Sequence, residues 1–291
     1  MLIRTLIMTK KKILVTVKTY PTISKKYDEL VCTAGFDEDG NWIRIYPIPF
    51  RKLDYVHQYK KYQWIEMDLI RNKSDFRPES YSPRNIDAAD VITFHDKLGT
   101  EENWAERKKI ILRNIYDDMS ALIAEAKTKG LYTSLGVFKP AEIKDFVCKP
   151  VEKEWSEKQK ATLEQERLFD KKSTHEIVKK LPYKFSYTFC DVNGTESTLM
   201  NEDWEIGALF WNCLEKNHGD EHAACEDVRK KYWDDFAKTK DLYFFLGTTK
   251  LNQLRAPNPF IIGTFHPKKD LQSKLEILIS QSKIAAFHLT C

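Results

Sequence analysis

Apolar and polar residues alternate with a period of two along most of the first quarter of the chain. This period is typical of strands that bury one face. It predicts strands at Lys12–Tyr20, Tyr27–Phe36, Trp42–Tyr46 and Tyr62–Ile70. Asp37–Asn41 is expected to be a tight turn, because Gly40 accepts the positive φ that such a reversal needs. The segment Asn72–Asn85 is expected to be a loop.

A helical spacing of apolar residues replaces this alternation after residue 100. It predicts one helix over Glu102–Lys129, with Gly130 as its stop signal. Leu135–Val147 reads as a short strand and turn. The second half again mixes strands with helices. Strands are expected at Tyr183–Cys190, Thr195–Met200, Leu242–Gly247 and Pro259–Phe265, and helices at 151–173, Asp203–Asn217, Glu221–Lys238 and Leu271–Gln281.

These elements predict an α+β protein of two domains, which suits a length of 291 residues. We expect an N-terminal domain over 1–150 with a helical insertion, a helical linker over 151–178 and a C-terminal domain over 179–291. Both halves use the same kinds of element, but no sequence repeat demonstrates a duplication.

Charge and cysteine content narrow the class of protein. The net charge is +4, and residues 1–150 carry the excess, with 26 Lys and Arg against 21 Asp and Glu. A polyanion is therefore expected to contact the first half, at a small or weak site.

Six cysteines in this length, and a start that lacks a signal-peptide cleavage site, favour a reducing cytoplasm. No apolar run is long enough for a membrane span, and the sequence leaves open whether Met1 or Met8 is the start.

Cations alternate with aromatic rings between Lys18 and Tyr81. Side chains on a strand alternate between faces, so Trp42, Arg44 and Tyr46 share one face of their strand. Guanidinium groups beside flat rings suit phosphates and stacked bases. The predicted ligand-binding residues are Lys18, Tyr20, Trp42, Arg44, Tyr46, Arg51, Arg77 and Tyr81. The alternative is that Arg44 and Arg77 form ion pairs with Glu29, Asp75 or Glu79 and brace the loop.

Other polar clusters give weaker signals, and we predict no catalytic residue, metal site or cofactor. Cys213, His218, His222 and Cys225 have irregular spacing for zinc, so buried thiols are the simpler interpretation. The acids Glu202, Asp203 and Glu205 could hold a metal, although a helix cap at Asp203 explains them better. Asp75 and Glu79 with Lys73 loosely suggest a nuclease, and Cys32 a nucleophile, but neither has the expected partners.

Four short elements in fixed order carry a resemblance to a known family. They are the run Lys18–Arg51, Asp75–Ser80, the helix start Asp203–Glu205, and the ending from Gly247 to Gly263. Together they resemble the bacterial dual-OB domain (DuOB-type) proteins. The resemblance implies two OB-like β-barrel domains elaborated with helices, and a role near phage-defence or DNA-processing genes. It transfers no catalytic residue.

The sequence therefore favours a binding protein over an enzyme. The leading hypothesis is binding of nucleic acid, single-stranded rather than duplex, or of a nucleotide, because no recognition helix is evident. One alternative is a non-catalytic interaction or sensor subunit with a protein partner. A second is a metal-dependent enzyme that acts on nucleic acid.

Overall fold

The computed structural model describes residues 10–24, 28–48, 50–53, 58–84, 92–157, 161, 178–255 and 258–269. Most of the expected linker over 151–178, the expected helix Leu271–Gln281, and both Met1 and Met8 lie outside these residues. No described helix is long and apolar enough to cross a membrane.

The first unit is a closed barrel of five strands. The barrel strands are β1 (Lys10–Lys18), β3 (Asp28–Phe36), β4 (Trp42–Ile48), β5 (Gln63–Arg71) and β6 (Ser80–Pro83). They follow the order β1-β3-β4-β6-β5, and β5 pairs with β1 to close the ring. Only the β4–β6 pair is parallel among these neighbours. This is the Greek-key order of an OB-fold barrel.

Three short elements decorate the barrel. They are β2 (Thr22–Ser24), which pairs with β3, β7 (Thr93–Lys97), which pairs with β5, and the 3₁₀ turn η1 (Phe50–Lys52). The barrel interior is filled by inward-facing residues of the alternating strands, such as Ile13, Ile45 and Ile65. Strand β6 lies within the segment that was expected to be a loop, and it is the strand that joins β4 to β5.

Two helices replace the single helix expected over Glu102–Lys129. They are α1 (Glu101–Ile111) and α2 (Met119–Lys127), with the short strand β8 (Ile115–Tyr116) between them. The carboxylate of Asp118 caps α2, because it accepts a hydrogen bond from the Ser120 amide at 2.7 Å. Because a new helix begins after Asp118, the single apolar pattern over Glu102–Lys129 belongs to two helices.

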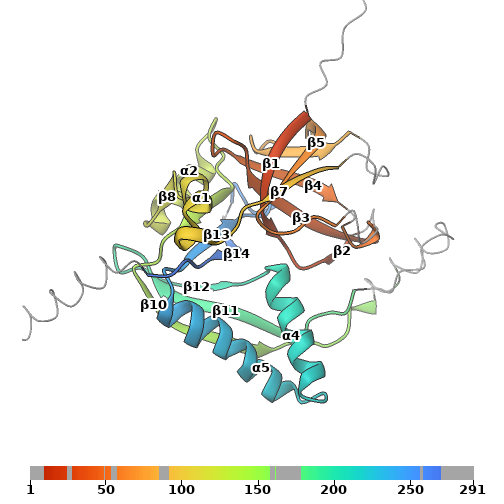
Figure 1. Ribbon diagram of the computed structural model, residues 1–291, viewed down its shortest axis with the longest axis vertical. Helices are drawn as coiled ribbons and strands as arrows, with labels where there is room; N and C mark the ends of the chain where they lie inside the picture. Colours follow the sequence, from red (N-terminus) through yellow and green to blue (C-terminus); the bar gives the residue numbers. More distant parts are fainter. Residues whose placement is uncertain are drawn as a thin grey trace, which may run out of the picture.

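The second unit contains two sheets, the helix α2, and the helices α4 and α5 (Figure 1). One sheet has the order β10 (Glu142–Pro150), β11 (Tyr183–Cys190), β12 (Glu196–Met200). The other has the order β14 (Phe260–Phe265), β13 (Tyr243–Gly247), β9 (Leu135–Phe138), β8. A parallel bridge between Asn201 and Ile261 joins the two sheets, which makes the unit barrel-like. The prediction of an α+β fold with barrel-like domains is confirmed.

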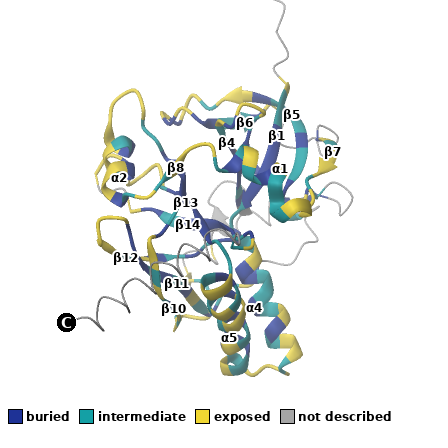
Figure 2. Ribbon diagram, turned by 60° about the vertical axis from the view of Figure 1, so that its left-hand side comes forward, coloured by how far each residue is buried: buried dark blue, intermediate teal, exposed yellow. Residues whose placement is uncertain are grey.

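Helices cover the three-stranded sheet of this unit. They are α4 (Trp204–Lys216), α5 (Glu221–Arg229) and its continuation η4 (Lys230–Ala237), which winds as a π-helix. Phe146 and Phe185 of the sheet pack in one cluster with Phe210 and Val228 of the helices. Asp203 caps α4, as the sequence predicts. Figure 2 shows buried segments on α4 and α5 and along β13 and β14.

Strand pairing places residues 115–150 with the second unit. Strand β9 pairs with β13, and β10 pairs with β11. The sequence-based boundary at residue 150 assigned both strands to the first domain. Periodicity alone could not show this, because the pairing partners lie about 40 to 110 residues further along the chain.

Candidate functional site

The outward face of β3 and β4 is covered by the second unit around Trp42 and Arg44. The Trp42 ring lies 4.0 Å from that of Phe36 and 5.7 Å from that of Phe245 on β13, measured between centroids. In OB barrels this face commonly receives oligonucleotides. We call the contact between the barrel and the sheet of β9, β13 and β14 the seam. The seam takes the place of an open binding face.

Arg44 is buried in the seam, where it is 4% exposed. Its Nη1 donates to the Ser134 hydroxyl at 2.7 Å and to Glu79 Oε1 at 3.3 Å, while Nη2 donates to the Ser134 carbonyl at 3.2 Å. Ser134 also donates to Glu79. The expectation that Arg44 presents an open guanidinium is wrong, because Glu79 neutralises it and Ser134 of the second unit covers it.

Arg77 occupies a parallel position and is also buried. Its Nη2 and Nε donate to the Asp75 carboxylate at 2.6 and 2.9 Å, and its Nη1 donates to the Thr248 carbonyl at 2.8 Å. Burial alone would raise the pKa of Asp75, but the hydrogen bonds and charge of Arg77 lower it to about 2. The expectation of an open guanidinium is therefore wrong for Arg77 as well.

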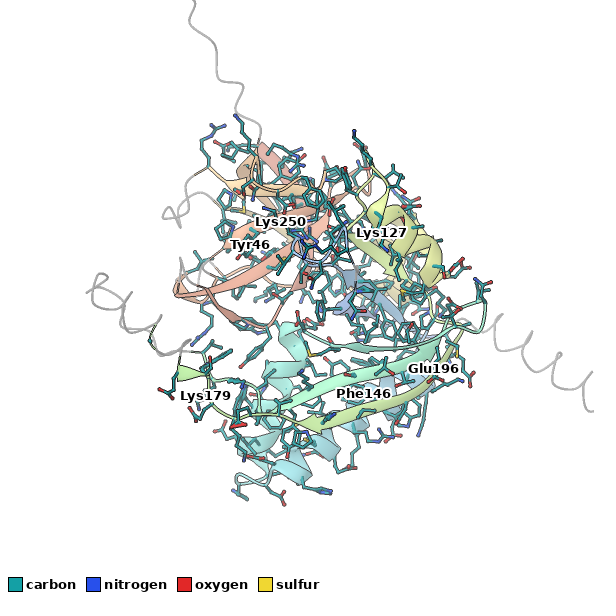
Figure 3. The ribbon with its side chains drawn as sticks, turned by 180° about the vertical axis from the view of Figure 1, so that it is seen from behind. Tyr46, Lys127, Phe146, Lys179, Glu196 and Lys250 are labelled. Carbon is teal, nitrogen blue, oxygen red and sulfur yellow. The ribbon has the colours of Figure 1, made fainter. Side chains whose placement is uncertain are left out.

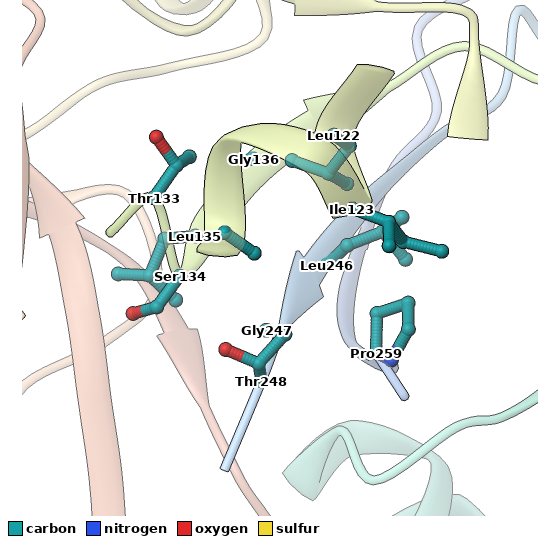
Figure 4. A pocket seen from close by; sticks show the side chains of 11 residues that line it. Leu122, Ile123, Thr133, Ser134, Leu135, Gly136, Leu246, Gly247, Thr248 and Pro259 are labelled. Carbon is teal, nitrogen blue, oxygen red and sulfur yellow. The ribbon is translucent and has the colours of Figure 1, made fainter. Parts of the chain in front are cut away.

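The residues that receive the two arginines lie together in the second unit. The Thr248 amide donates to the Ser134 carbonyl at 3.0 Å, at the adjoining ends of β9 and β13. Figure 4 shows Ser134, Leu135, Gly247 and Thr248 there, around a cavity of about 10 Å³. Such a space holds at most one water molecule. This small cavity therefore has no room for a ligand, although Ser134 and Leu135 also line a larger cleft.

Besides Arg44 and Arg77, the lysines Lys18 and Lys61 contribute polar groups to the contact between the units. Lys61 Nζ donates to Asp203 at 2.8 Å and to Glu205 at 3.0 Å, and these two carboxylates raise its pKa despite its burial. Lys18 Nζ lies 4.6 Å from the centre of the Phe50 ring, and burial lowers its pKa to about 8. The predicted ligand residue Lys18 is therefore mostly enclosed by the protein's own rings.

The remaining predicted residues separate into three places. Tyr20 and Arg51 line one small pocket, beside Trp204. Trp42 and Tyr81 line a larger cleft. Tyr46 stands apart on the barrel surface, where it is 42% exposed (Figure 3). The eight predicted ligand-binding residues therefore do not lie together at one site.

The larger cleft lies between the barrel and the segments around β8 and β9, and its volume is about 830 Å³. Ligand sites of this size are typical at the junctions between domains. Aromatic rings from both units line it, together with two cations and two carboxylates of the first unit. The residues that matter for the argument are Trp42, Tyr81 and Tyr116, together with Lys11 and Arg113.

Two cations lie near the ring of Tyr81, which lines the cleft. Strand β6 holds Tyr81 next to Ile45 of β4. Lys11 Nζ lies 4.8 Å from the centre of its ring, and Arg71 Cζ lies 5.9 Å from it. Arg71 also donates to the carbonyls of Ser80 and Arg77, which fixes the strand. The ring and its two cations form a platform suited to a base and its phosphate.

Arg113 reaches the cleft across the β3–β4 turn. Its Nε donates to the Lys109 carbonyl at 3.0 Å. Gly40 has a φ of +83°, and a Cβ there would lie 2.7 Å from Arg113 Cδ, so glycine allows both the turn and this close approach. Asp37 stabilises the turn by accepting bonds from the Asn41 amide at 2.8 Å and its side chain at 3.1 Å.

Tyr116 comes from β8, on the side of the second unit. Its hydroxyl donates to Glu125 at 2.6 Å, and Thr133 donates to the same carboxylate at 3.0 Å. Burial and the neighbouring carboxylate raise the pKa of Tyr116 to about 12, so the phenol stays neutral. Glu125 thus fixes the Tyr116 ring from outside the cleft, because Glu125 itself does not line the cleft.

Sequence reasoning missed Lys11, Arg113 and Tyr116. Lys11 precedes the first aromatic-rich segment, and the other two fell inside the predicted long helix. Asp117-Asp118 before an apolar run is the one signal that could have revealed a helix start, and hence the surface segment before it.

The alternative chemistries find little support in the described residues. There, no three His, Cys, Asp or Glu side chains lie close enough to hold a metal ion. Cys213 and Cys225 are both buried, and burial raises the pKa of the Cys32 thiol even though Arg44 and Arg77 oppose that effect. A raised pKa disfavours a thiolate nucleophile.

Fold and site define a class: an α+β protein in which an OB-like barrel is fused to a barrel-like second unit, with an aromatic cleft between them. The chain belongs to the family described as "Domain of unknown function (DUF8757)", whose model matches residues 116–284. A second model, "Domain of unknown function (DUF8758)", matches residues 9–113. The first match ends just before β8, and the second begins within it. No curated protein matches the chain.

Proposed function

We propose that this protein binds single-stranded nucleic acid, or a nucleotide, in the cleft. The observation that carries the proposal is the grouping of Trp42, Tyr81 and Tyr116 with Lys11 and Arg113 around a space of about 830 Å³. Unpaired bases stack on such rings without sequence preference, while cations at the rim hold the phosphates.

The charge of the cleft sets the strength of binding. Lys11 and Arg113 line the cleft, and Arg71 lies near the Tyr81 ring from outside the lining. Two carboxylates also line it: Asp37, and Glu79, which is already paired with Arg44. Neutralising about three phosphates of a single strand gives a slope of about −2 for log K against log[salt]. Base stacking adds on the order of 1–3 kcal/mol per base. We therefore expect a weak site that is readily competed by salt.

The biological setting is part of the same proposal. The resemblance to dual-OB domain proteins supports a role in a bacterial phage-defence or DNA-processing system. The described cysteines Cys32, Cys148, Cys190, Cys213 and Cys225 are all free thiols, which supports a cytoplasmic location.

Fluorescence anisotropy with a labelled single-stranded oligonucleotide tests the proposal. The variant Tyr81→Ala/Arg113→Glu removes one ring and reverses one charge, and we expect it to weaken binding at least about tenfold. Lys149→Glu is the matched control, since Lys149 is an exposed residue of β10 in the other sheet. A duplex of the same sequence should bind less tightly. Equal affinity of wild type and the double variant would overturn the proposal.

A second candidate is an interaction subunit that binds a protein partner. Leu251 and Leu254 are 85% and 52% exposed on the loop after β13. Gln253 anchors this loop, because its amide donates to the carbonyls of Ala126, Tyr132 and Thr133 at 3.0–3.1 Å. A fixed loop that exposes two leucines favours docking. This candidate predicts that the purified chain has no affinity for oligonucleotides at any salt concentration.

A further inference from the structure

Two cysteine thiols from distant parts of the chain meet inside the second unit. Cys148 lies on β10 and Cys225 on α5, 77 residues further along. The helix packs on the sheet that contains β10 (Figure 1). The Cys148 thiol donates to the Cys225 carbonyl, with 3.9 Å between sulfur and oxygen, and it also shares a hydrogen bond with the Cys225 thiol. Both thiols are free in the structure.

The strand and the helix hold these two thiols together. Cys148 follows Phe146 by two residues on β10, so both side chains face the core cluster to which Cys225 belongs. Arg229 lies one turn after Cys225 on α5 and donates to the Phe146 carbonyl and, at 3.1 Å, to the Asp145 carboxylate. The contact between the thiols therefore belongs to a fixed junction of α5 with β10.

The shared hydrogen bond makes the two thiols chemically unequal. It raises the pKa of Cys148, whose thiol is the donor, and it lowers the pKa of Cys225, while burial and the charges of Glu221 and Glu226 oppose the second effect. Cys225 is therefore the sulfur that ionises more readily. The thiolate is the nucleophilic form of cysteine, and a neighbouring thiol that supports it is a feature of redox-active dithiols.

Exposure limits which reagents can reach the pair. Cys148 is half-buried, and Cys225 is 7% exposed. A small, uncharged oxidant such as a hydroperoxide suits this position better than a bulky disulfide. Cytoplasmic disulfides are usually transient and serve catalysis or redox sensing, so free thiols at rest are compatible with oxidation on demand.

We propose that Cys148 and Cys225 form a reversible disulfide when a hydroperoxide oxidises the protein. The Cys225 thiolate attacks hydrogen peroxide: an S–O bond forms, the O–O bond breaks, and the departing hydroxide takes up the proton that Cys225 had lost. The Cys148 sulfur then attacks the sulfenic sulfur of Cys225. An S–S bond forms, the S–O bond breaks, and the departing hydroxide takes the Cys148 proton. Two thiols lose two electrons in total, and one peroxide is reduced to two waters.

The disulfide ties α5 to β10 and closes a loop over 77 residues of the chain. Closing such a loop restricts the unfolded chain more than the folded one, so oxidation should raise the urea midpoint of unfolding. No residue of β10 or α5 lines the cleft, so this inference does not depend on the proposed function.

Peptide mapping by mass spectrometry, after treatment of the full chain with hydrogen peroxide, tests the inference. We expect a peptide pair joined through Cys148 and Cys225, two hydrogen atoms lighter than the reduced peptides, which dithiothreitol separates again. Cys225→Ala should abolish this product. Cys213→Ala is the matched control, because Cys213 is also 7% exposed and lies on the adjoining helix α4, and it should leave the product unchanged.

The order of the two steps has its own test. Cys148→Ala removes the second thiol, so peroxide should leave a sulfenic acid on Cys225 that dimedone labels. A label missing from Cys225 in this variant would overturn the assigned order.

The wild type alone decides the main claim, even if a variant fails to fold. Peptides of Cys148 and Cys225 that stay unlinked while other cysteines are oxidised would overturn it, as would disulfides that join either one to a different cysteine. A urea midpoint that falls after the crosslink forms would also overturn it, because the bond would then strain the fold.

Discussion

Arg44 on β4 and Tyr81 on β6 lie on neighbouring strands, yet Arg44 faces the seam and Tyr81 lines the cleft. In the seam each arginine has a carboxylate from the same barrel, and the neutral pair is buried against a carbonyl of the second unit. In the cleft, Lys11 and Arg113 form no ion pair with any described residue. A cation that the chain pairs with an acid is a structural group here, and we propose that the cations without a described acid partner, Lys11 and Arg113, bind the ligand.

The largest expected effect comes from breaking the seam. Arg77→Met leaves the buried Asp75 without its partner, and loss of one member of a buried ion pair costs about 3–5 kcal/mol. Urea denaturation followed by circular dichroism measures this loss in the free energy of unfolding. The double variant Asp75→Leu/Arg77→Met removes both charges and should recover much of the loss. A single variant within about 1 kcal/mol of wild type would show that the seam does not depend on this pair.

Acid should weaken the seam, because the Asp75–Arg77 pair requires an ionised carboxylate. The folded pKa of Asp75, about 2, lies below its ordinary value near 3.8, so its contribution is complete above about pH 4 and disappears as the pH falls through 2. The contribution is on the order of 1–2 kcal/mol. Unfolding free energies at pH 2, 3, 4 and 5 should fall more steeply for wild type than for Asp75→Asn. Parallel curves would contradict this assignment.

The smallest expected effect comes from removing one cation of the cleft. Arg113→Gln removes one cation that makes no described ion pair, so the free energy of unfolding should change by less than about 0.5 kcal/mol. The slope of log K against log[salt] for a single-stranded oligonucleotide should become less negative by about 0.7. An unchanged slope, together with unchanged stability, would remove Arg113 from the binding site.

Local patterns in the sequence predicted most of the strands, because alternation and turn glycines depend on neighbouring residues. The β3–β4 hairpin around Gly40 and the cap at Asp203 are examples. The alternation of Trp42 and Arg44 opposite Ile43 and Ile45 also proved correct. What covers that face could not be predicted, since Ser134 and Phe245 are about 90 to 200 residues away in the chain.

The ion-pair alternative for Arg44 and Arg77 was visible in the sequence, but burial decides between the two interpretations. Asp75 lies two residues before Arg77, and that spacing alone fits either a solvent-exposed loop or a buried clamp. The cleft was harder to predict, because Tyr116 belongs to a two-residue strand whose partner, β9, begins almost twenty residues later. Isolated β pairs of this length leave no periodic signal.

Photo-crosslinking with an oligonucleotide that contains 5-iodouracil, followed by mass spectrometry of the peptides, tests the central claim most directly. The reaction joins the base to an aromatic side chain that it touches, so the site of the adduct identifies the binding surface. The cleft predicts adducts on Tyr81, Tyr116 or Trp42, which Tyr81→Ala/Arg113→Glu should suppress. Adducts confined to Tyr46 or to the rings of the small pocket at α4, or none at concentrations that saturate binding, would contradict it.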